Sequence, residues 1–256
     1  MIKPPLRYPG AKWVLSKWIC ANLPPHEVYL EPFFGSGAVF FRKDPSATET
    51  INDLDGNVIN LFKVIRTRTE ELCAAVSLTP WARDEYKASY HLSGEEDELE
   101  RARVFLVRCW QAFGVRTGQS TGWRNRTTGS RPRDPDVWRT LPDRLAIAAR
   151  RLLNAQIENM DAIALIQRYN APNCLIYADP PYMAATRCAK IYAYECDDSY
   201  HVWLLDALEA HRGAVVLSGY DHPLYNERLS HWRRVEKKTY AERGAIRNEV
   251  LWIKDA

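Results

Sequence analysis

The sequence predicts an α/β protein with an open, doubly wound sheet that is interrupted by a mostly helical insertion. Short apolar segments rich in β-branched and aromatic residues alternate with amphipathic helical segments along most of the chain. A glycine turn follows the first of these strands and acidic residues follow the second, which is typical of a parallel sheet that binds a nucleoside at its carboxyl edge. The region 67–150 lacks this alternation and is the predicted insertion.

The strands and helices of the sheet domain can be placed from their apolar patterns. Residues 28–34 (VYLEPFF) form the first predicted strand, followed by the turn GSG and by AVFF, which we expect to open a helix. The strand ETINDLD (49–55) ends in acids, and NVINLFKVIR (57–66) has the spacing of an amphipathic helix. Three further strands are predicted in the second part of the domain, CLIYA (174–178), AVVLS (214–218) and EVLWI (249–253). Residues 1–66 and 151–256 therefore form one predicted α/β domain.

The insertion 67–150 carries an unusual concentration of positive charge. Residues 95–113 (EEDELERARVFLVRCWQAF) are predicted to be helical, whereas 114–136 (GVRTGQSTGWRNRTTGSRPRDPD) is expected to project as a long loop or hairpin. Residues 101–150 hold eleven arginines, three aspartates and no glutamate, a net charge of +8 that leaves −5 for the rest of the chain. A local basic block of this kind indicates a polyanionic partner.

Composition excludes several classes of protein. With 256 residues, 46% of them hydrophobic and 26% charged, the chain is expected to be a soluble globular protein. No apolar run approaches the ~20 residues of a transmembrane helix, and the first residues lack the apolar centre of a signal peptide, so a cytoplasmic location is expected. The six cysteines and six histidines are scattered, which predicts reduced thiols and no metal site.

The segment DPPY, which follows the buried strand CLIYA, is the most specific chemical feature. Each proline fixes its own φ and disfavours helix in the residue before it, so Asp179 and Pro180 are held extended. Neither Pro180 nor Pro181 donates an N–H, which leaves a corner of hydrogen-bond acceptors beside the ring of Tyr182. This corner suits a planar ligand with an exocyclic amino group, and we expect these four residues to be catalytic.

The glycine loop EPFFGSG points to a small cofactor. Gly35 and Gly37 allow the backbone to turn sharply and to approach a ligand closely, although a G-x-G pair is equally compatible with an ordinary tight turn. The chain has no G-x-G-x-x-G and no G-x-x-x-x-G-K-[ST] motif. A nucleoside-type cofactor is therefore favoured over a dinucleotide or a triphosphate.

The ordered segments RYPGAK, EPFFGSG, INDLDGNVINLF, ENMDA, DPPY, VVLSGYD and RNEVLWI resemble the Dam-type family of S-adenosylmethionine-dependent DNA adenine-N6 methyltransferases. The resemblance covers essentially the whole chain. It implies a Rossmann-like methyltransferase fold with a mixed sheet, in which 67–150 is the DNA target-recognition domain and 1–66 and 151–256 are the catalytic domain. It also implies S-adenosylmethionine as methyl donor, no metal, double-stranded DNA as partner, and a monomer or weak dimer associated with the nucleoid.

The resemblance further implies roles for individual residues. Tyr8 and Lys12 of the N-terminal segment are implied to lie against the cofactor, and the loop with Glu31, Phe33, Gly35 and Gly37 is implied to surround its methionine and adenosine. Asp53 would bind the ribose, Asp161 the adenine, and Asp179 would face the reaction centre. The sequence departs from the family at two of these positions. A tyrosine stands at position 8, where the family often has tryptophan, and NMDA, which contains Asp161, stands where the family often has a G-D-F-like motif.

Contacts to DNA are expected from the insertion and from two segments near the target base. Arg116, Arg124 and Arg126 are candidates for reading guanine edges or holding phosphates, with Gln119 and Trp123 as partners, although a solvated basic loop is equally compatible for each residue. SGYDHP (218–223) resembles a motif that lines the target-base pocket, with an ordinary turn as the alternative. Three tyrosines in the loop after DPPY are placed to close over a flipped base, or to lie at the surface: Tyr192, Tyr194 and Tyr200.

Alternative functions stay open to different degrees. Cytosine-N4 methyltransferases share the chemistry but more often carry a serine before the two prolines, and protein-glutamine enzymes carry an asparagine, so Asp179 favours adenine. Carbon-5 cytosine methylation requires a nucleophilic cysteine, commonly after a proline, and no cysteine of this chain follows a proline. A catalytically inactive DNA-binding relative is disfavoured because the DPPY segment and the glycine loop are both intact.

Overall fold

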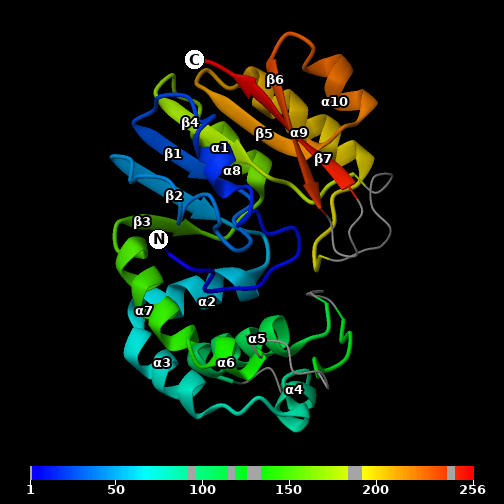
Figure 1. Cartoon of the computed structure of the whole chain (residues 1–256). Coiled ribbons are helices and arrows are strands. Elements are labelled where there is room, and N and C mark those ends of the chain that lie inside the picture. The colour runs from blue at the N-terminus through cyan, green and yellow to red at the C-terminus, as the bar shows by residue number, and fades with distance from the viewer. Residues whose placement is uncertain (1, 92–95, 115–118, 126–133, 184–191, 241–245) are drawn as a thin grey trace.

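A mixed β-sheet forms the centre of the molecule, which is known from a computed structural model that describes residues 2–91, 96–114, 119–125, 134–183, 192–240 and 246–256 (Figure 1). Within these residues the sheet has seven strands, in the order β3-β2-β1-β4-β5-β7-β6. Strands β1 to β5 are parallel where they pair, and β7 runs antiparallel to both of its neighbours. The strand bounds are β1 Val28–Glu31, β2 Thr48–Asn52, β3 Ala155–Glu158, β4 Cys174–Ala178, β5 Val215–Tyr220, β6 Arg233–Tyr240 and β7 Ile246–Lys254.

The central strands are buried on both faces of the sheet, as expected when helices cover both sides. In β4, for example, Leu175 packs into one hydrophobic cluster and Ile176 into the other. The first cluster contains residues of α1 (Ser16–Cys20) and α2 (Gly56–Thr67), and the second contains residues of α8 (Ala162–Arg168), α9 (Asp198–Ala210) and α10 (Pro223–Arg228). The predicted doubly wound α/β fold is therefore confirmed.

A layer of helices lies between β2 and β3 along the chain and occupies the lower part of Figure 1. It comprises α2 and the helices α3 Thr69–Leu78, α4 Arg83–Ala88, α5 Glu98–Gln111, α6 Asp134–Trp138 and α7 Leu141–Leu152. The helix predicted over 95–113 begins only at Glu98, because the Asp97 side chain accepts the backbone N–H of Glu100 as an N-cap. Directly after α5, Ala112 pairs with Trp123 in an antiparallel bridge, so the basic segment starts as a hairpin. The limits 67 and 150 for a recognition domain remain a prediction.

The structure also differs from the sequence prediction in one turn and in two strands, and the first predicted strand, 28–34, ends at Glu31. The helix predicted to start at AVFF (38–41) is wrong, because this segment forms consecutive turns whose side chains are all buried against the aromatic core. Strands β3 and β6 were not predicted. Both lie at the edges of the sheet, where exposed polar residues replace the apolar pattern of a buried strand.

Candidate active site

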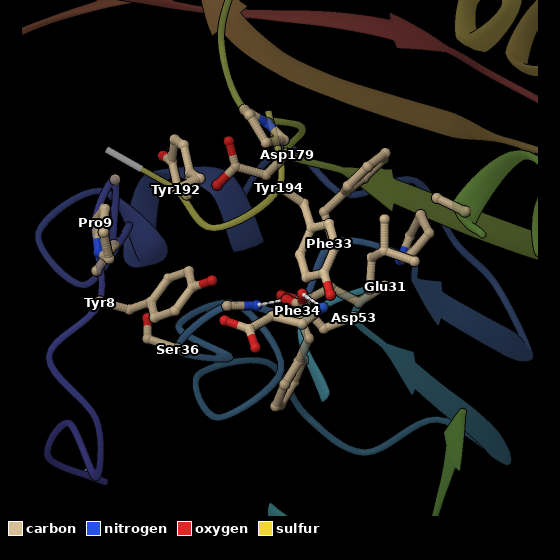
Figure 2. A pocket seen from close by; sticks show the side chains of 18 of the residues that line it. Tyr8, Pro9, Glu31, Phe33, Phe34, Ser36, Asp53, Asp179, Tyr192 and Tyr194 are labelled. Carbon is tan, nitrogen blue, oxygen red and sulfur yellow. Dashed lines mark hydrogen bonds between the residues drawn. The ribbon is translucent and has the colours of Figure 1, made fainter. Parts of the chain in front are cut away.

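A cavity of about 360 Å³ lies at the carboxyl edge of the sheet, beyond the ends of β1, β2 and β4 (Figure 2). The strand order reverses between β1 and β4, and ligands of open α/β sheets bind at such switch points. The cavity has the size of a small-molecule site. Its walls include eight of the residues predicted from the sequence, namely Tyr8, Lys12, Glu31, Phe33, Gly35, Asp53, Asp179 and Pro181. Gly37, Asp161, Pro180 and Tyr182 are not among its lining residues.

The glycine loop owes its shape to left-handed backbone conformations. Gly35 has φ +47° and Gly37 has φ +66°, values that favour glycine over other residues. A Cβ atom at Gly37 would lie 2.4 Å from the ring of Phe34, and one at Gly35 would lie 3.0 Å from the ring of Tyr8. Gly35 therefore lets the loop approach Tyr8 across the cavity, whereas Gly37 turns the loop back onto the core.

Asp53 holds the glycine loop to the end of β2. Its Oδ2 atom accepts the backbone N–H of Gly35 at 2.8 Å, and its Oδ1 atom accepts that of Asp55 at 2.9 Å. Burial raises the pKa of Asp53 to about 7, and these two N–H groups oppose the shift. The carboxyl group therefore holds the glycine loop in place through its hydrogen bonds in the ligand-free protein.

Asn52, at the end of β2, joins three segments near the cavity through hydrogen bonds. It was not among the site residues predicted from the sequence. Its amide nitrogen donates to the carbonyl oxygens of Pro32 at 2.9 Å and Met160 at 3.0 Å. Its amide oxygen accepts the N–H of Met160 at 2.9 Å. These bonds tie together the segments that follow β1, β2 and β3, so a buried amide at a strand end was the signal to look for.

Glu31 ends β1 inside the cavity wall and is buried. The hydroxyl of Tyr29 donates to its Oε2 atom at 2.7 Å. Burial raises the pKa of Glu31 to about 8, outweighing the hydrogen bond from Tyr29, which lowers it. In the ligand-free protein at neutral pH this carboxyl group is therefore mostly protonated.

Asp179 leaves the end of β4 and forms an ion pair with Lys12 from the N-terminal segment. Lys12 Nζ lies 3.0 Å from Asp179 Oδ1, and it also donates to the carbonyl oxygen of Gly10 at 3.0 Å. Burial raises the pKa of Asp179 to about 6, the charge of Lys12 opposes this shift, and the charge of Glu249 adds to it. For Lys12, burial lowers the pKa, but the charges of Asp179 and Glu249 outweigh burial and raise it.

Tyr182 packs beside this ion pair, against the face formed by β5 and β7. Its ring lies edge-on to Tyr220 with a centroid distance of 4.6 Å, and Lys12 Nζ sits 4.6 Å from its centroid. The hydroxyl group contacts Ser218 Oγ at 3.2 Å and donates to the carboxylate of Glu249. Ser218 and Tyr220 belong to the predicted SGYDHP segment, but Glu249 was missed. A single acid at the start of the apolar segment EVLWI was the available signal.

Tyr192, Tyr194 and Tyr200 belong to the cavity wall, and Asp161 lies behind it in contact with Tyr200. Asp161 is the N-cap of α8, where it accepts the N–H of Ala164 at 2.9 Å, and it also accepts the hydroxyl of Tyr200 at 3.2 Å. Tyr192, Tyr194 and Tyr200 line the cavity. The prediction that Tyr200 lies in a loop is wrong, because Asp197 caps α9 and Tyr200 falls in the first turn of that helix. Residues 184–191 of the predicted lid lie outside the described residues.

Three of the predicted DNA-contacting residues, Gln119, Trp123 and Arg124, lie in the described part of the segment after α5. Gln119 is exposed, whereas Trp123 packs under Arg83 and donates from Nε1 to Gln111 Oε1 at 3.3 Å. Arg124 donates to the carbonyl oxygen of Ala112 at 3.2 Å and lies 3.4 Å from Asp134. These contacts engage Trp123 and Arg124 within the fold of the hairpin. Arg116 and Arg126 lie outside the described residues, so all DNA contacts of this set stay predictions.

The described part of the chain contains no group of three or more His, Cys, Asp or Glu side chains that could hold a metal ion. None of its helices combines the length and apolar character required to span a bilayer.

Comparison with known proteins places the chain in a family. DNA adenine methylase from Salmonella typhi is 25% identical over 239 residues, which covers 87% of this chain and 82% of that protein. The Serratia marcescens DNA adenine methylase is 28% identical over 202 residues, covering 74% and 70%. Among solved structures, a putative methyltransferase from Escherichia coli covers 100% of this chain and 92% of its own at 11% identity, with a TM-score of 0.40 that is too low to support an argument.

The match to a family covers most of the chain. The description "D12 class N6 adenine-specific DNA methyltransferase" fits residues 8–238, a span that runs from Tyr8 in the cavity wall through the insertion and DPPY to strand β6. The chain therefore belongs to the family of D12 class N6 adenine-specific DNA methyltransferases.

Proposed function

We propose that this protein transfers a methyl group from S-adenosylmethionine to the N6 amino group of an adenine that is flipped out of duplex DNA. The observation that carries the proposal is the position of Asp179. Asp179 follows β4 at the switch point of the sheet and lines the cavity, and two prolines and Tyr182 follow it in the sequence. The chain also belongs to an adenine-specific DNA methyltransferase family.

The charge of the cavity fits S-adenosylmethionine. Three carboxyl groups, those of Glu31, Asp53 and Asp179, have raised pKa values because they are buried around the same space. A positive charge nearby would stabilise the ionised form of each of these groups. S-adenosylmethionine carries an ammonium group and a sulfonium centre, and its sulfonium supplies the activated methyl group. Glu31, Asp53, Tyr8 and Phe33 are the residues that would hold it.

The acceptor corner explains how an aromatic amino group becomes reactive. Its lone pair is delocalised into the ring, which makes it a poor nucleophile. When Asp179 and the Pro180 carbonyl accept its two N–H bonds, the nitrogen can pyramidalise and direct its lone pair outward. The negative charge of Asp179 also stabilises the positive charge that grows on the nitrogen, an effect of about 3 kcal/mol in comparable preorganised sites. After transfer, Asp179 is placed to accept the proton that the amino group loses.

The target base has to be flipped out of the duplex, because its amino group cannot reach the active site while the base is stacked and paired. Flipping costs a few kcal/mol, and stacking on an aromatic ring such as that of Tyr182 returns about 1–3 kcal/mol per base. The basic segment of 67–150 supplies the phosphate contacts in this proposal, in a cytoplasmic enzyme that acts as a monomer or weak dimer. Such contacts hold the duplex while one base leaves the stack.

The proposal is tested by incubating the protein with unmethylated duplex DNA and labelled S-adenosylmethionine, followed by digestion and mass spectrometry of the nucleosides. We expect N6-methyladenine from the wild type and from a variant of the exposed Asp44, Asp44→Ala, and none from Asp179→Ala. N4-methylcytosine would overturn the choice of base while keeping the mechanism. Binding of cofactor and DNA without transfer would overturn the proposed activity.

A further inference from the structure

Glu249 reaches the active site because β7 runs against the direction of its neighbour β5. The carboxyl end of β5 lies beside the amino end of β7, and Tyr220 is the register partner of Glu249. Paired residues of an antiparallel ladder point to the same face. The Glu249 side chain, 3% exposed, therefore lies on the same face as Tyr220, where its Oε1 atom accepts the hydroxyl of Ser218 at 2.8 Å and that of Tyr182.

Lys12 creates an electrostatic problem for the proposed reaction. Its Nζ atom lies 3.0 Å from Asp179 Oδ1, and both side chains are largely buried. A carboxylate that is neutralised by an adjacent ammonium group is a weak stabiliser of a cation, because the two fields nearly cancel. Yet positive charge has to be stabilised on the amino nitrogen beside Asp179.

A second carboxylate resolves this problem. Lys12 Nζ lies 3.6 Å from Glu249 Oε1, so a single ammonium group is shared by two acids and the cluster as a whole is negative. If Asp179 turns toward an amino group, Glu249 still pairs with Lys12, which avoids the large cost of leaving a buried ammonium unpaired.

We propose that Glu249 is a positioning residue that serves as the counter-ion of Lys12 during methyl transfer, so that Asp179 keeps its negative charge for the amino group of the target base. The inference rests on the proposed function. It assigns Glu249 no contact with base or cofactor: the residue acts through Lys12 and through the hydroxyl of Tyr182.

Other ionisable groups surround the pair and set the background of any pH measurement. Those that interact electrostatically with Asp179 or with Lys12 come from β1, β4, the segments after β4 and α10, and are Glu31, Tyr177, Tyr182, Tyr192 and Tyr225. The variants below leave these groups in place, so a change in the pH profile reports on the cluster of two acids and one lysine.

The test compares kcat as a function of pH in the wild type and in Glu249→Gln, which keeps an acceptor for Tyr182 and Ser218 but removes the charge. We expect kcat to fall by about tenfold, less than the roughly hundredfold or greater loss found when a preorganised group that touches the reacting atoms is removed. The acidic limb of the profile is expected to move to lower pH, because the pKa of Asp179 loses one of the charges that raise it. Base flipping, followed by 2-aminopurine fluorescence at the target position, should persist.

A double-mutant cycle with Lys12→Gln isolates the coupling. If Glu249 acts by compensating Lys12, the double variant should lose less activity than the product of the two single losses. Lys12→Gln alone should shift the acidic limb to higher pH, and this shift remains measurable even if Glu249→Gln does not fold. Glu249→Asp keeps the charge and should keep the limb near its wild-type position. Glu236→Gln, which removes an exposed acid from the neighbouring strand β6, is the matched control and should change nothing.

The outcomes separate this inference from the proposed function. A wild type that forms no N6-methyladenine would overturn the proposed function. With an active wild type, an unmoved acidic limb in Glu249→Gln together with strictly multiplicative losses in the cycle would overturn the inference alone. A loss of flipping and of thermal stability at an unchanged limb would make Glu249 a structural support of Tyr182, which also contradicts the proposal.

Discussion

Binding of S-adenosylmethionine is expected to release protons from the cavity, and the number of protons can be worked out from the structure. Burial raises the pKa of Glu31 to about 8 and that of Asp53 to about 7 in the ligand-free protein. At pH 7 the first group is then about 90% protonated and the second about half protonated. A ligand that brings an ammonium and a sulfonium charge into this space lowers both pKa values, which gives a release of about one to one and a half protons per cofactor.

The release is measured by titration calorimetry at pH 7 in two buffers with different enthalpies of ionisation. The dependence of the observed enthalpy on the buffer gives the proton number directly. Because the released protons are linked to binding, affinity for the cofactor should rise by about tenfold or more between pH 6 and pH 8. S-adenosylhomocysteine lacks the sulfonium charge and should release fewer protons. In Glu31→Gln the release should fall by roughly one proton, the share of that group.

Two results would refute this reasoning. A proton number near zero for the wild type at pH 7 would mean that the carboxyl groups are already ionised without the ligand or do not face its charges. An unchanged proton number in Glu31→Gln would show that the protons come from elsewhere.

Three further predictions concern stability and DNA affinity. Because burial raises the pKa of Glu31 from 4.5 to about 8, the folded state keeps a proton that the unfolded chain has released, so the Tm of the ligand-free protein should fall as pH rises from 5 to 8. Glu31→Gln should remove about half of that slope, since the raised pKa values of Asp53 and Asp179 contribute the rest, and an equal slope in the variant would contradict the assignment. Asn52→Ala leaves the buried carbonyl of Pro32 and the partly buried backbone groups of Met160 without this partner. It should lower the free energy of unfolding in urea by about 2–4 kcal/mol, whereas a loss under about 1 kcal/mol would contradict the role of Asn52 in joining these segments. Duplex affinity, measured by fluorescence anisotropy, should weaken by about tenfold or more between 50 and 200 mM salt, and a flat response would remove the phosphate-contact role of the basic block.

The sequence was most informative where burial and function coincide. The strand before DPPY was predicted at its observed bounds, Cys174–Ala178, because five consecutive apolar residues followed by two prolines leave little choice. The order of motifs also brought Glu31, Asp53 and Asp179 to one cavity, since the carboxyl ends of parallel strands meet at the same edge.

The contacts that the sequence did not reveal depend on tertiary structure. Glu249 is 237 positions from Lys12 along the chain, and nothing local to EVLWI indicates that the strand would run antiparallel and deliver its first residues to the site. Trp123 and Arg124 have contacts within the fold that their residue types did not reveal, and their contacts to DNA stay predictions. Residue type favoured contacts to DNA for both, and the structure engages them in the base of the hairpin, with Gln111, Arg83 and Asp134 as partners.

The contact between Lys12 and Glu249 affects the order in which parts of the active site form during synthesis and folding. The contact closes a loop of nearly the whole chain, and long-range contacts form late because the entropy of loop closure has to be overcome first. On the ribosome, Lys12 and Asp179 emerge well before β7 is complete. The glycine loop and DPPY can therefore form in the nascent protein before Glu249 is available to pair with Lys12. Full methyl-transfer activity is then expected only after the hairpin of β6 and β7 has docked on the sheet.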